Sequence, residues 1–148
     1  MQTDKFVRRA QRFIGDAGTV DQTVVIQKRP LSTFVAGIGA FLAVAVILGL
    51  LGVSNFFIVG VLGGAALGGA MGALTKNYYL AGVGSEIQMI ELSRWAGRPE
   101  TLVKTFDRPL DITVSKGVLI KSVTIDGEQF VFSKLFEDEL DLLSASSG

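Results

Sequence analysis

The side chains that most often carry enzymatic chemistry are absent or dispersed in this sequence. Its 148 residues include no His and no Cys, so the commonest general base and the usual imidazole and thiolate metal ligands are missing. The three methionines, Met1, Met71 and Met89, lie in separate parts of the chain. We therefore predict no catalytic residue, no metal site and no bound cofactor, and we expect a protein that is not an enzyme.

Three patterns that resemble functional motifs have simpler structural interpretations. The glycine-rich stretch GVLGGAALGGAMGAL lacks the Gly-Lys-Ser or Gly-Lys-Thr ending of a phosphate-binding loop. The acidic residues between positions 136 and 143 lack the alternate spacing of an EF-hand loop, so we interpret them as a solvated helix face. Ser93 with Lys104, or Ser115 with Lys116, has no activating partner visible in the sequence, so we assign no nucleophile.

The excess of hydrophobic residues is concentrated in two long apolar runs. Residues 31–53 and 56–74 are each about 20 residues long, which as a helix is about 30 Å and matches a bilayer core. We predict a membrane hairpin of two transmembrane helices. The alternative, a buried hairpin in a soluble protein, is disfavoured because the remaining chain is too short to cover it. No Asp, Glu, Lys, Arg or His occurs between positions 31 and 75, so the hairpin offers no proton relay or charged transport site.

The placement of basic residues predicts the orientation. Six precede the first run and Lys76 follows the second, whereas the connecting turn has none. By the positive-inside rule, both termini are cytoplasmic and the protein is a multi-pass protein of the inner (plasma) membrane. Basic and acidic residues number 14 each, so no basic excess indicates nucleic-acid binding. We expect membrane lipid and other membrane-protein subunits as partners, and neither nucleic acid nor a small-molecule substrate.

A row of glycines dominates the second run. Glycines at every fourth position lie near one helix face and let another backbone approach closely; they are Gly60, Gly64, Gly68 and Gly72. The first run also carries small residues, so packing within the hairpin is the default expectation. Glycines that the hairpin does not use would mark the contact with a partner.

The N-terminal segment, residues 1–30, begins with an amphipathic basic helix. Its apolar stripe contains Phe6 and Phe13, and its basic residues include Arg8, Arg9 and Arg12. This helix either lies in the cytoplasmic membrane interface or docks on a partner, or it is a frayed terminus that only sets topology. Trp95, between Arg94 and Arg98, either anchors at the headgroups or in a partner, or plugs one end of a sheet.

The remaining chain has the pattern of a small β domain. We expect a domain over residues 76–143, a disordered tail over 144–148, and a short strand over 19–27 that adds to the edge of the sheet. Predicted strands cover residues 78–83, 87–92, 101–105, 110–114 and 117–120, with a hairpin over 123–132 and a closing helix over 134–143. Asp126-Gly127 favours a two-residue hairpin turn. A helix over 85–96 competes with the strand over 87–92.

The segment from Asn77 to Leu143 resembles the PH-like domains attached to small bacterial, especially actinobacterial, membrane proteins. The shared pattern is an opening hairpin, a Gly-Arg-Pro loop (residues 97–99), several short strands and a closing helix. The turn around Gly84 departs from this pattern, because that family often has a charged turn there. The resemblance implies a mostly-β, PH-like sheet with a C-terminal helix and a binding or scaffolding role.

The whole arrangement is also loosely similar to accessory subunits of the actinobacterial cytochrome bc–cytochrome c oxidase supercomplex. This similarity implies a structural subunit of a respiratory assembly that carries no redox centre itself. The alternative hypothesis is a homo-oligomeric small channel or holin-like pore, although neither apolar run has the polar stripe of a wet pore.

Overall fold

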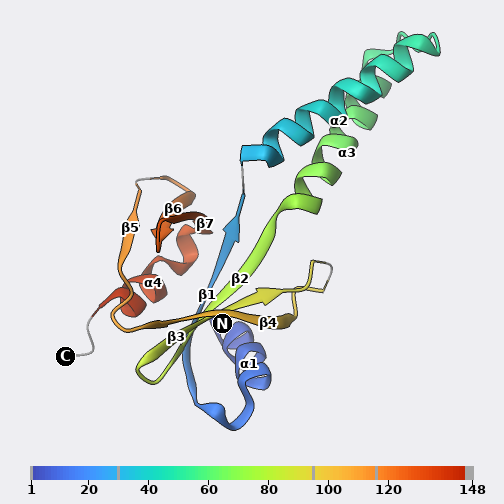
Figure 1. The fold of residues 1–148 in the computed structure, drawn as a ribbon. Coiled ribbons are helices and arrows are strands. Elements are labelled where there is room, and N and C mark those ends of the chain that lie inside the picture. Colours follow the sequence, from blue (N-terminus) through green and yellow to red (C-terminus); the bar gives the residue numbers. More distant parts are fainter. Residues whose placement is uncertain (1, 30, 95, 116, 146–148) are drawn as a thin grey trace. The chain divides into compact units, whose positions relative to one another are not determined.

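The chain forms two compact units, a helical pair and a β domain (Figure 1). The computed structural model describes residues 2–29, 31–94, 96–115 and 117–145. Residues 29–75 form the helical unit, and residues 1–28 form the β unit together with residues 76–148. The N-terminal segment therefore belongs to the same unit as the C-terminal half, although the sequence suggests two separate parts.

The helical unit consists of α2 (Leu31–Leu50) and α3 (Phe56–Leu74). Both are long and apolar enough to cross a membrane. α2 stops three residues before the predicted end at position 53, because Gly52 adopts a left-handed φ of 76°. The N–H of Val53 then donates to the carbonyl of Leu48 at 2.9 Å, which closes the helix end. Asn55 begins α3 by accepting a hydrogen bond from the N–H of Phe57 at 3.0 Å.

Close contact between α2 and α3 depends on one glycine from each helix. A Cβ on Gly63 would lie 2.6 Å from the ring of Phe41, and one on Gly37 would lie 2.9 Å from Cγ of Met71. Both distances are shorter than any normal carbon–carbon contact. The two helices therefore pack through Gly37 and Gly63, each against a large side chain of the other helix.

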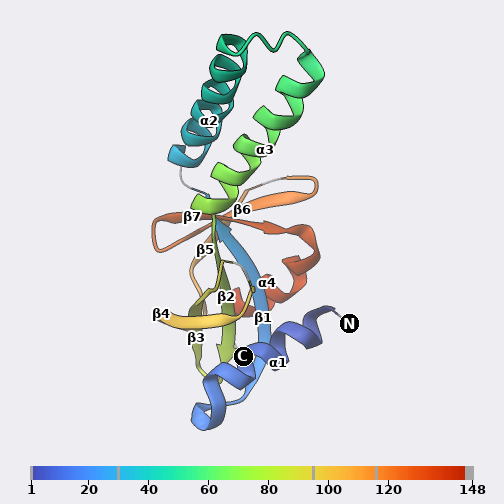
Figure 2. The ribbon, with the colours of Figure 1, turned by 90° about the vertical axis from the view of Figure 1, so that its right-hand side faces the viewer.

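The β unit contains a seven-stranded antiparallel sheet with the order β4-β3-β2-β1-β7-β6-β5. Two α-helices, α1 and α4 (Figures 1 and 2), and two short 3₁₀ segments, η1 and η2, accompany it. Their bounds are α1 (Gln2–Ile14), η1 (Gly15–Ala17), β1 (Val20–Lys28), β2 (Lys76–Val83), β3 (Glu86–Leu92), β4 (Pro99–Asp107), β5 (Ile112–Val114), β6 (Ile120–Ile125), β7 (Glu128–Ser133), η2 (Lys134–Phe136) and α4 (Glu137–Ser144).

β1 lies in the centre of the sheet, so its predicted place at the edge is wrong. It pairs with β2 from Val20↔Val83 to Lys28↔Lys76, and with β7 through Ile26↔Phe132. The helical hairpin is thus the connection between two neighbouring antiparallel strands. This pairing holds Lys28 and Lys76, at which the chain leaves and re-enters the β unit, beside each other.

Both faces of the sheet are covered. α4 contributes Leu140 and Leu143 to the larger core, which also contains Val24, Leu80 and Phe130. On the other face, α1 covers a second core; its members are Ala10, Val20, Tyr79, Ala81, Ile90 and Leu92, flanked by Phe6, Val7, Ile14, Val25 and Val83. Alternating side chains of β1, β2 and β3 enter the two cores in turn, as the two-residue period of a strand requires.

The turns agree with the sequence more closely than the strand ends do. Asp126 and Gly127 have φ values of 53° and 78°, as a two-residue turn between β6 and β7 requires. The predicted hairpin is confirmed there, and β3 replaces the competing helix over 85–96.

The strand predicted over 117–120 is wrong for residues 117–119, because pairing begins only at Ile120. The predicted tail begins one residue early, since Ser144 ends α4, and residues 146–148 lie outside the described residues.

The α2–α3 contact predicts different outcomes at adjacent glycines. We expect Gly63→Val to lower the stability of the hairpin by about 1–3 kcal/mol, since the new methyls must displace the ring of Phe41. Gly64→Val is the control, because nothing lies within 4 Å of a Cβ at Gly64. Thermal unfolding of the full chain in mild detergent, followed by circular dichroism, compares the two variants. Equal loss of stability in both would contradict the packing described above.

Candidate functional site

The four glycines of the predicted row are exposed within the helical unit. Nothing lies within 4 Å of a Cβ placed on Gly60, Gly64, Gly68 or Gly72, and all four are exposed. The default expectation that this row packs against the first helix is wrong. α2 instead packs against the adjacent face of α3, on which Gly63 lies against the ring of Phe41. Consecutive residues of a helix point in different directions, so Gly63 can face α2 while its neighbour Gly64 does not. The whole predicted row is therefore left uncovered by the described residues.

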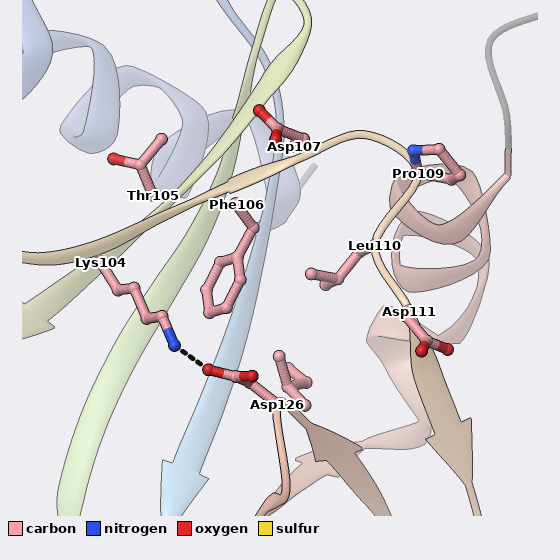
Figure 3. A pocket seen from close by; sticks show the side chains of 9 residues that line it. Lys104, Thr105, Phe106, Asp107, Pro109, Leu110, Asp111 and Asp126 are labelled. Atoms are coloured by element: carbon pink, nitrogen blue, oxygen red, sulfur yellow. Dashed lines mark ion pairs between the residues drawn. The ribbon is translucent and has the colours of Figure 1, made fainter.

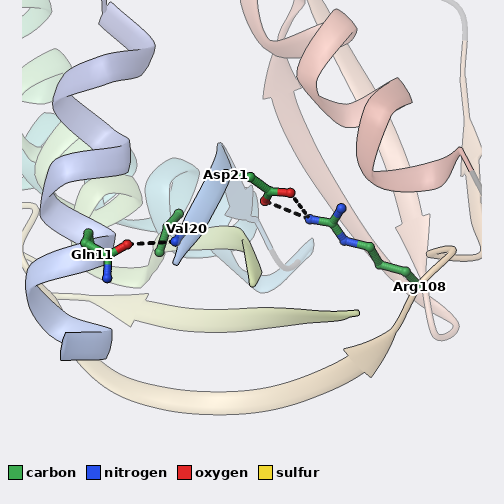
Figure 4. A network of polar contacts seen from close by, with 4 residues as sticks. All are labelled: Gln11, Val20, Asp21 and Arg108. Carbon is green, nitrogen blue, oxygen red and sulfur yellow. Dashed lines mark hydrogen bonds and ion pairs between the residues drawn. The ribbon is translucent and has the colours of Figure 1, made fainter. Parts of the chain in front are cut away.

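α1 is fastened to the sheet by Gln11. Its Nε2 donates to the carbonyls of Gly15 at 3.0 Å and Gly18 at 2.8 Å. Its Oε1 accepts the N–H of Val20 at 2.7 Å, which ties the helix to the first residue of β1 (Figure 4). The orientation of α1 on the sheet is therefore set by polar contacts as well as by its buried apolar face.

The two aromatic residues of α1 differ in their surroundings. The ring of Phe6 packs edge-on against Tyr79 and Phe136, with centroids 5.7 and 5.8 Å apart. Phe13 is 38% exposed. The membrane-interface or partner anchoring predicted for these rings stays a prediction, and Phe13 is the ring that the fold leaves available for it.

The basic residues of α1 face outward and approach the β3–β4 loop. Arg8 and Arg12 are exposed, and Nη1 of Arg9 lies 3.5 Å from the carbonyl oxygen of Gly97. A shallow cavity of about 400 Å³ is lined by these three arginines with Asp4 and Lys5. Trp95, predicted to anchor beside them, lies outside the described residues.

Ion pairing separates the cations of the β unit into two groups. Lys28, Lys76, Lys104, Arg108 and Lys121 each pair with a carboxylate. Within the described part of the chain, the basic residues of α1 and of the β3–β4 loop make no ion pair; they are Lys5, Arg8, Arg9, Arg12, Arg94 and Arg98. The contact of Arg9 with the carbonyl oxygen of Gly97 brings these two groups of unpaired cations close together.

The ion pair between Arg108 and Asp21 was not predicted from the sequence. Nη2 of Arg108 donates to both carboxylate oxygens of Asp21, at 2.8 and 3.0 Å (Figure 4). The side chain of Arg108 is only 11% exposed. A Cβ on Gly82 would collide with Nη2 of Arg108 and Oδ1 of Asp21, so the pair crosses β2 where no side chain intervenes. It joins the start of β1 to the segment that follows β4.

A second cavity of about 400 Å³ lies beside the end of β4 (Figure 3). Lys104 pairs with Asp126 and stacks over the ring of Phe106, with Nζ 5.1 Å from the ring centroid. Asp107 and Asp111 also line the cavity. Among the described residues, no three Asp, Glu, His or Cys side chains lie close enough together to hold a metal ion. This cavity offers charged and aromatic contacts but no nucleophile paired with a base.

The raised pKa of the Tyr78 hydroxyl makes it unsuited to act as a general acid or base near neutral pH. Burial in the larger core raises its pKa above the usual 10.0, and the charges of Glu91 and Glu128 raise the pKa further. The hydroxyl therefore stays neutral at physiological pH.

The β5–β6 loop carries an exposed apolar surface that the sequence did not predict. Val118, Leu119 and Leu135 are 84%, 76% and 75% exposed, and Ile120 is 58% exposed. The run Val-Leu-Ile after Gly117 suggests a buried strand, which is why its exposure was missed. Four large apolar side chains that meet water in one region are unusual on a soluble surface.

No protein-family model matches the chain, and no curated protein or solved structure matches it. Any functional argument for the surfaces described above therefore depends on their geometry.

The Asp21–Arg108 pair predicts unequal effects of removing two carboxylates. We expect Asp21→Ala to lower the free energy of unfolding by about 1–3 kcal/mol, because it leaves a shielded guanidinium without its acceptor. Glu128→Ala removes the partner of Lys28 from a pair with side chains 35% and 57% exposed, so its cost is expected below about 1 kcal/mol. Denaturant unfolding of both variants in the same detergent measures the difference. A larger loss for Glu128→Ala would contradict this ranking.

Proposed function

We propose that α2 and α3 span the plasma membrane as a hairpin, with the β unit and both termini in the cytoplasm. The paired strands β1 and β2 support this topology, because one sheet receives the chain on both sides of the hairpin. A folded sheet lies on one side of a bilayer, so the chain must cross an even number of times. The basic residues beside the hairpin, Lys28, Arg29 and Lys76, favour the cytoplasmic side.

We further propose that the β unit is PH-like. The antiparallel sheet and the closing helix α4, which buries Leu140 and Leu143 against it, support this assignment. The unit is larger than the resemblance suggests, because it includes β1 and α1 from before the hairpin. The membrane hairpin then occupies the connection between the first two strands of the domain.

The function we propose is that of a non-catalytic accessory subunit in a larger membrane complex. The exposed row of Gly60, Gly64, Gly68 and Gly72 carries this proposal, because nothing within the described chain covers it. In lipid, helices associate by close packing of small residues, and such a row lets another backbone approach. The resemblance noted above makes the actinobacterial cytochrome bc–cytochrome c oxidase supercomplex the first complex to test.

The proposed topology predicts which side of the membrane two introduced cysteines face. The chain has no Cys, so Ser54→Cys, between the helices, and Thr101→Cys, on β4, each carry one thiol. We expect a membrane-impermeant maleimide to label Ser54→Cys in intact cells and Thr101→Cys only after lysis, since both positions are exposed. Labelling of Thr101→Cys in intact cells would overturn the orientation.

The glycine row predicts a loss of assembly without a loss of the hairpin. Gly64→Ile and Gly68→Ile place bulk on the open face, so we expect the tagged chain to recover several-fold less of the complex from mild detergent. Gly49→Ile in α2 is the matched control, because a Cβ there also meets open space. Equal recovery from all three variants contradicts the proposal. A ring of this chain alone would instead support a homo-oligomeric pore.

A further inference from the structure

The exposed apolar residues of the β5–β6 loop and η2 form one surface, which we call the apolar tip. Its members are Val118, Leu119, Ile120 and Leu135, each between 58% and 84% exposed. The loop and η2 are joined, because the N–H of Lys134 donates to the carbonyl of Leu119 at 3.1 Å. The four side chains therefore belong to one local structure rather than to separate loops.

The backbone of the tip is held in place from both sides. The N–H of Ser115 donates to the carbonyl of Ser122 at 2.8 Å. A Cβ on Gly117 would collide with the carbonyl of Ile120, so the turn closes tightly only with glycine. Val118 and Leu119, which follow this close approach, are exposed and have no apolar cover among the described residues.

The tip lies at the end of the β unit through which the chain passes to the helices. Ile120 pairs with Ser133 on β7, and the adjacent Phe132 pairs with Ile26 on β1. By this register, Ile120 lies two strand spacings of about 5 Å from Val25 of β1, three residues before β1 ends at Lys28. Within the β unit, the start of β6 lies level with the end of β1 (Figures 1 and 2).

We propose that the apolar tip inserts into the cytoplasmic leaflet of the same bilayer that holds the hairpin. The proposal rests on the membrane topology proposed above. The chain itself keeps the end of β1 and β2 near the bilayer, since only Arg29 and Pro30 separate β1 from α2, and only Thr75 separates α3 from β2.

The charges around the tip fit lipid better than they fit an apolar protein surface. Lys134 is exposed and makes no ion pair among the described residues, and it adjoins Leu135. Glu137, the nearest acid of α4 along the chain, is occupied by Lys121. An apolar tip beside a free lysine is the pattern of interfacial insertion, with the cation at anionic headgroups and the aliphatic groups below them.

Insertion gives the β unit a third attachment besides its two chain connections. Two adjacent connections alone allow the unit to rotate about the line that joins them, whereas a contact away from that line fixes its orientation to the bilayer. The tip thereby determines which surfaces of the β unit remain open to the cytoplasm.

Site-directed spin labelling of the full chain tests this proposal, because the chain has no Cys. Val118→Cys and Leu119→Cys report on the tip, and Leu142→Cys on α4, 55% exposed, is the matched control. Ile47→Cys in α2, 56% exposed, is the reference for a membrane span. Each labelled protein is reconstituted alone into vesicles of equal parts phosphatidylcholine and phosphatidylglycerol, and its collisions with oxygen and with a water-soluble nickel chelate are measured.

We expect the oxygen-to-nickel collision ratio at Val118→Cys and Leu119→Cys to exceed that at Leu142→Cys several-fold and to approach that at Ile47→Cys. A ratio at both tip positions equal to that at Leu142→Cys overturns insertion. Low collision rates with both reagents also overturn it, because contact between two copies of the chain would shield the labels from lipid and water alike. If Ile47→Cys is itself water-accessible, the membrane hairpin fails, and not the tip alone.

Discussion

The antiparallel pairing of β1 with β2 is the interaction on which the rest of the structure depends. It runs from Val20↔Val83 to Lys28↔Lys76 and places an N-terminal strand at the centre of a sheet built mostly from C-terminal residues. Each covering helix depends on it, because β1 contributes residues to both cores. Because β1 and β2 lie in one sheet, both ends of the helical hairpin must also lie on the same side of the medium that surrounds the hairpin.

The structural features that were predicted best from the sequence are those determined by residues close together in the chain. Uninterrupted apolar runs gave the two helices, and Asp126-Gly127 gave the β6–β7 hairpin, because these features depend on residues close in the chain. The central position of β1 could not be read in this way. Its partners lie beyond a long insertion, and its β-branched composition suits an edge as well as a centre. The end of α2 was missed because apolar composition continues past Gly52, where the backbone turns.

The candidate surfaces, too, could be predicted from the sequence only in part. Periodicity identified the row of Gly60 and Gly64, but it could not decide whether this row or the adjacent face of α3, which contains Gly63, meets α2, since the two faces differ by a fraction of a turn. The Asp21–Arg108 pair was invisible because its members are far apart in the chain and meet only across Gly82. The group of unpaired cations on α1 and the β3–β4 loop could not be predicted either, because ion pairing is known only once the fold brings carboxylates to the other cations.

The insertion of a helical hairpin between two paired strands has a consequence for biogenesis. β1 leaves the ribosome before either helix, and its partner β2 is made only after both. During that interval Val24 and Ile26, fully buried in the finished sheet, have no strand to pair with, and such a segment is prone to aggregate. Closing so long a connection in solution carries an entropic cost. Insertion of the hairpin into a bilayer would bring the ends of the connection together, so the membrane would act as a template for a cytoplasmic sheet.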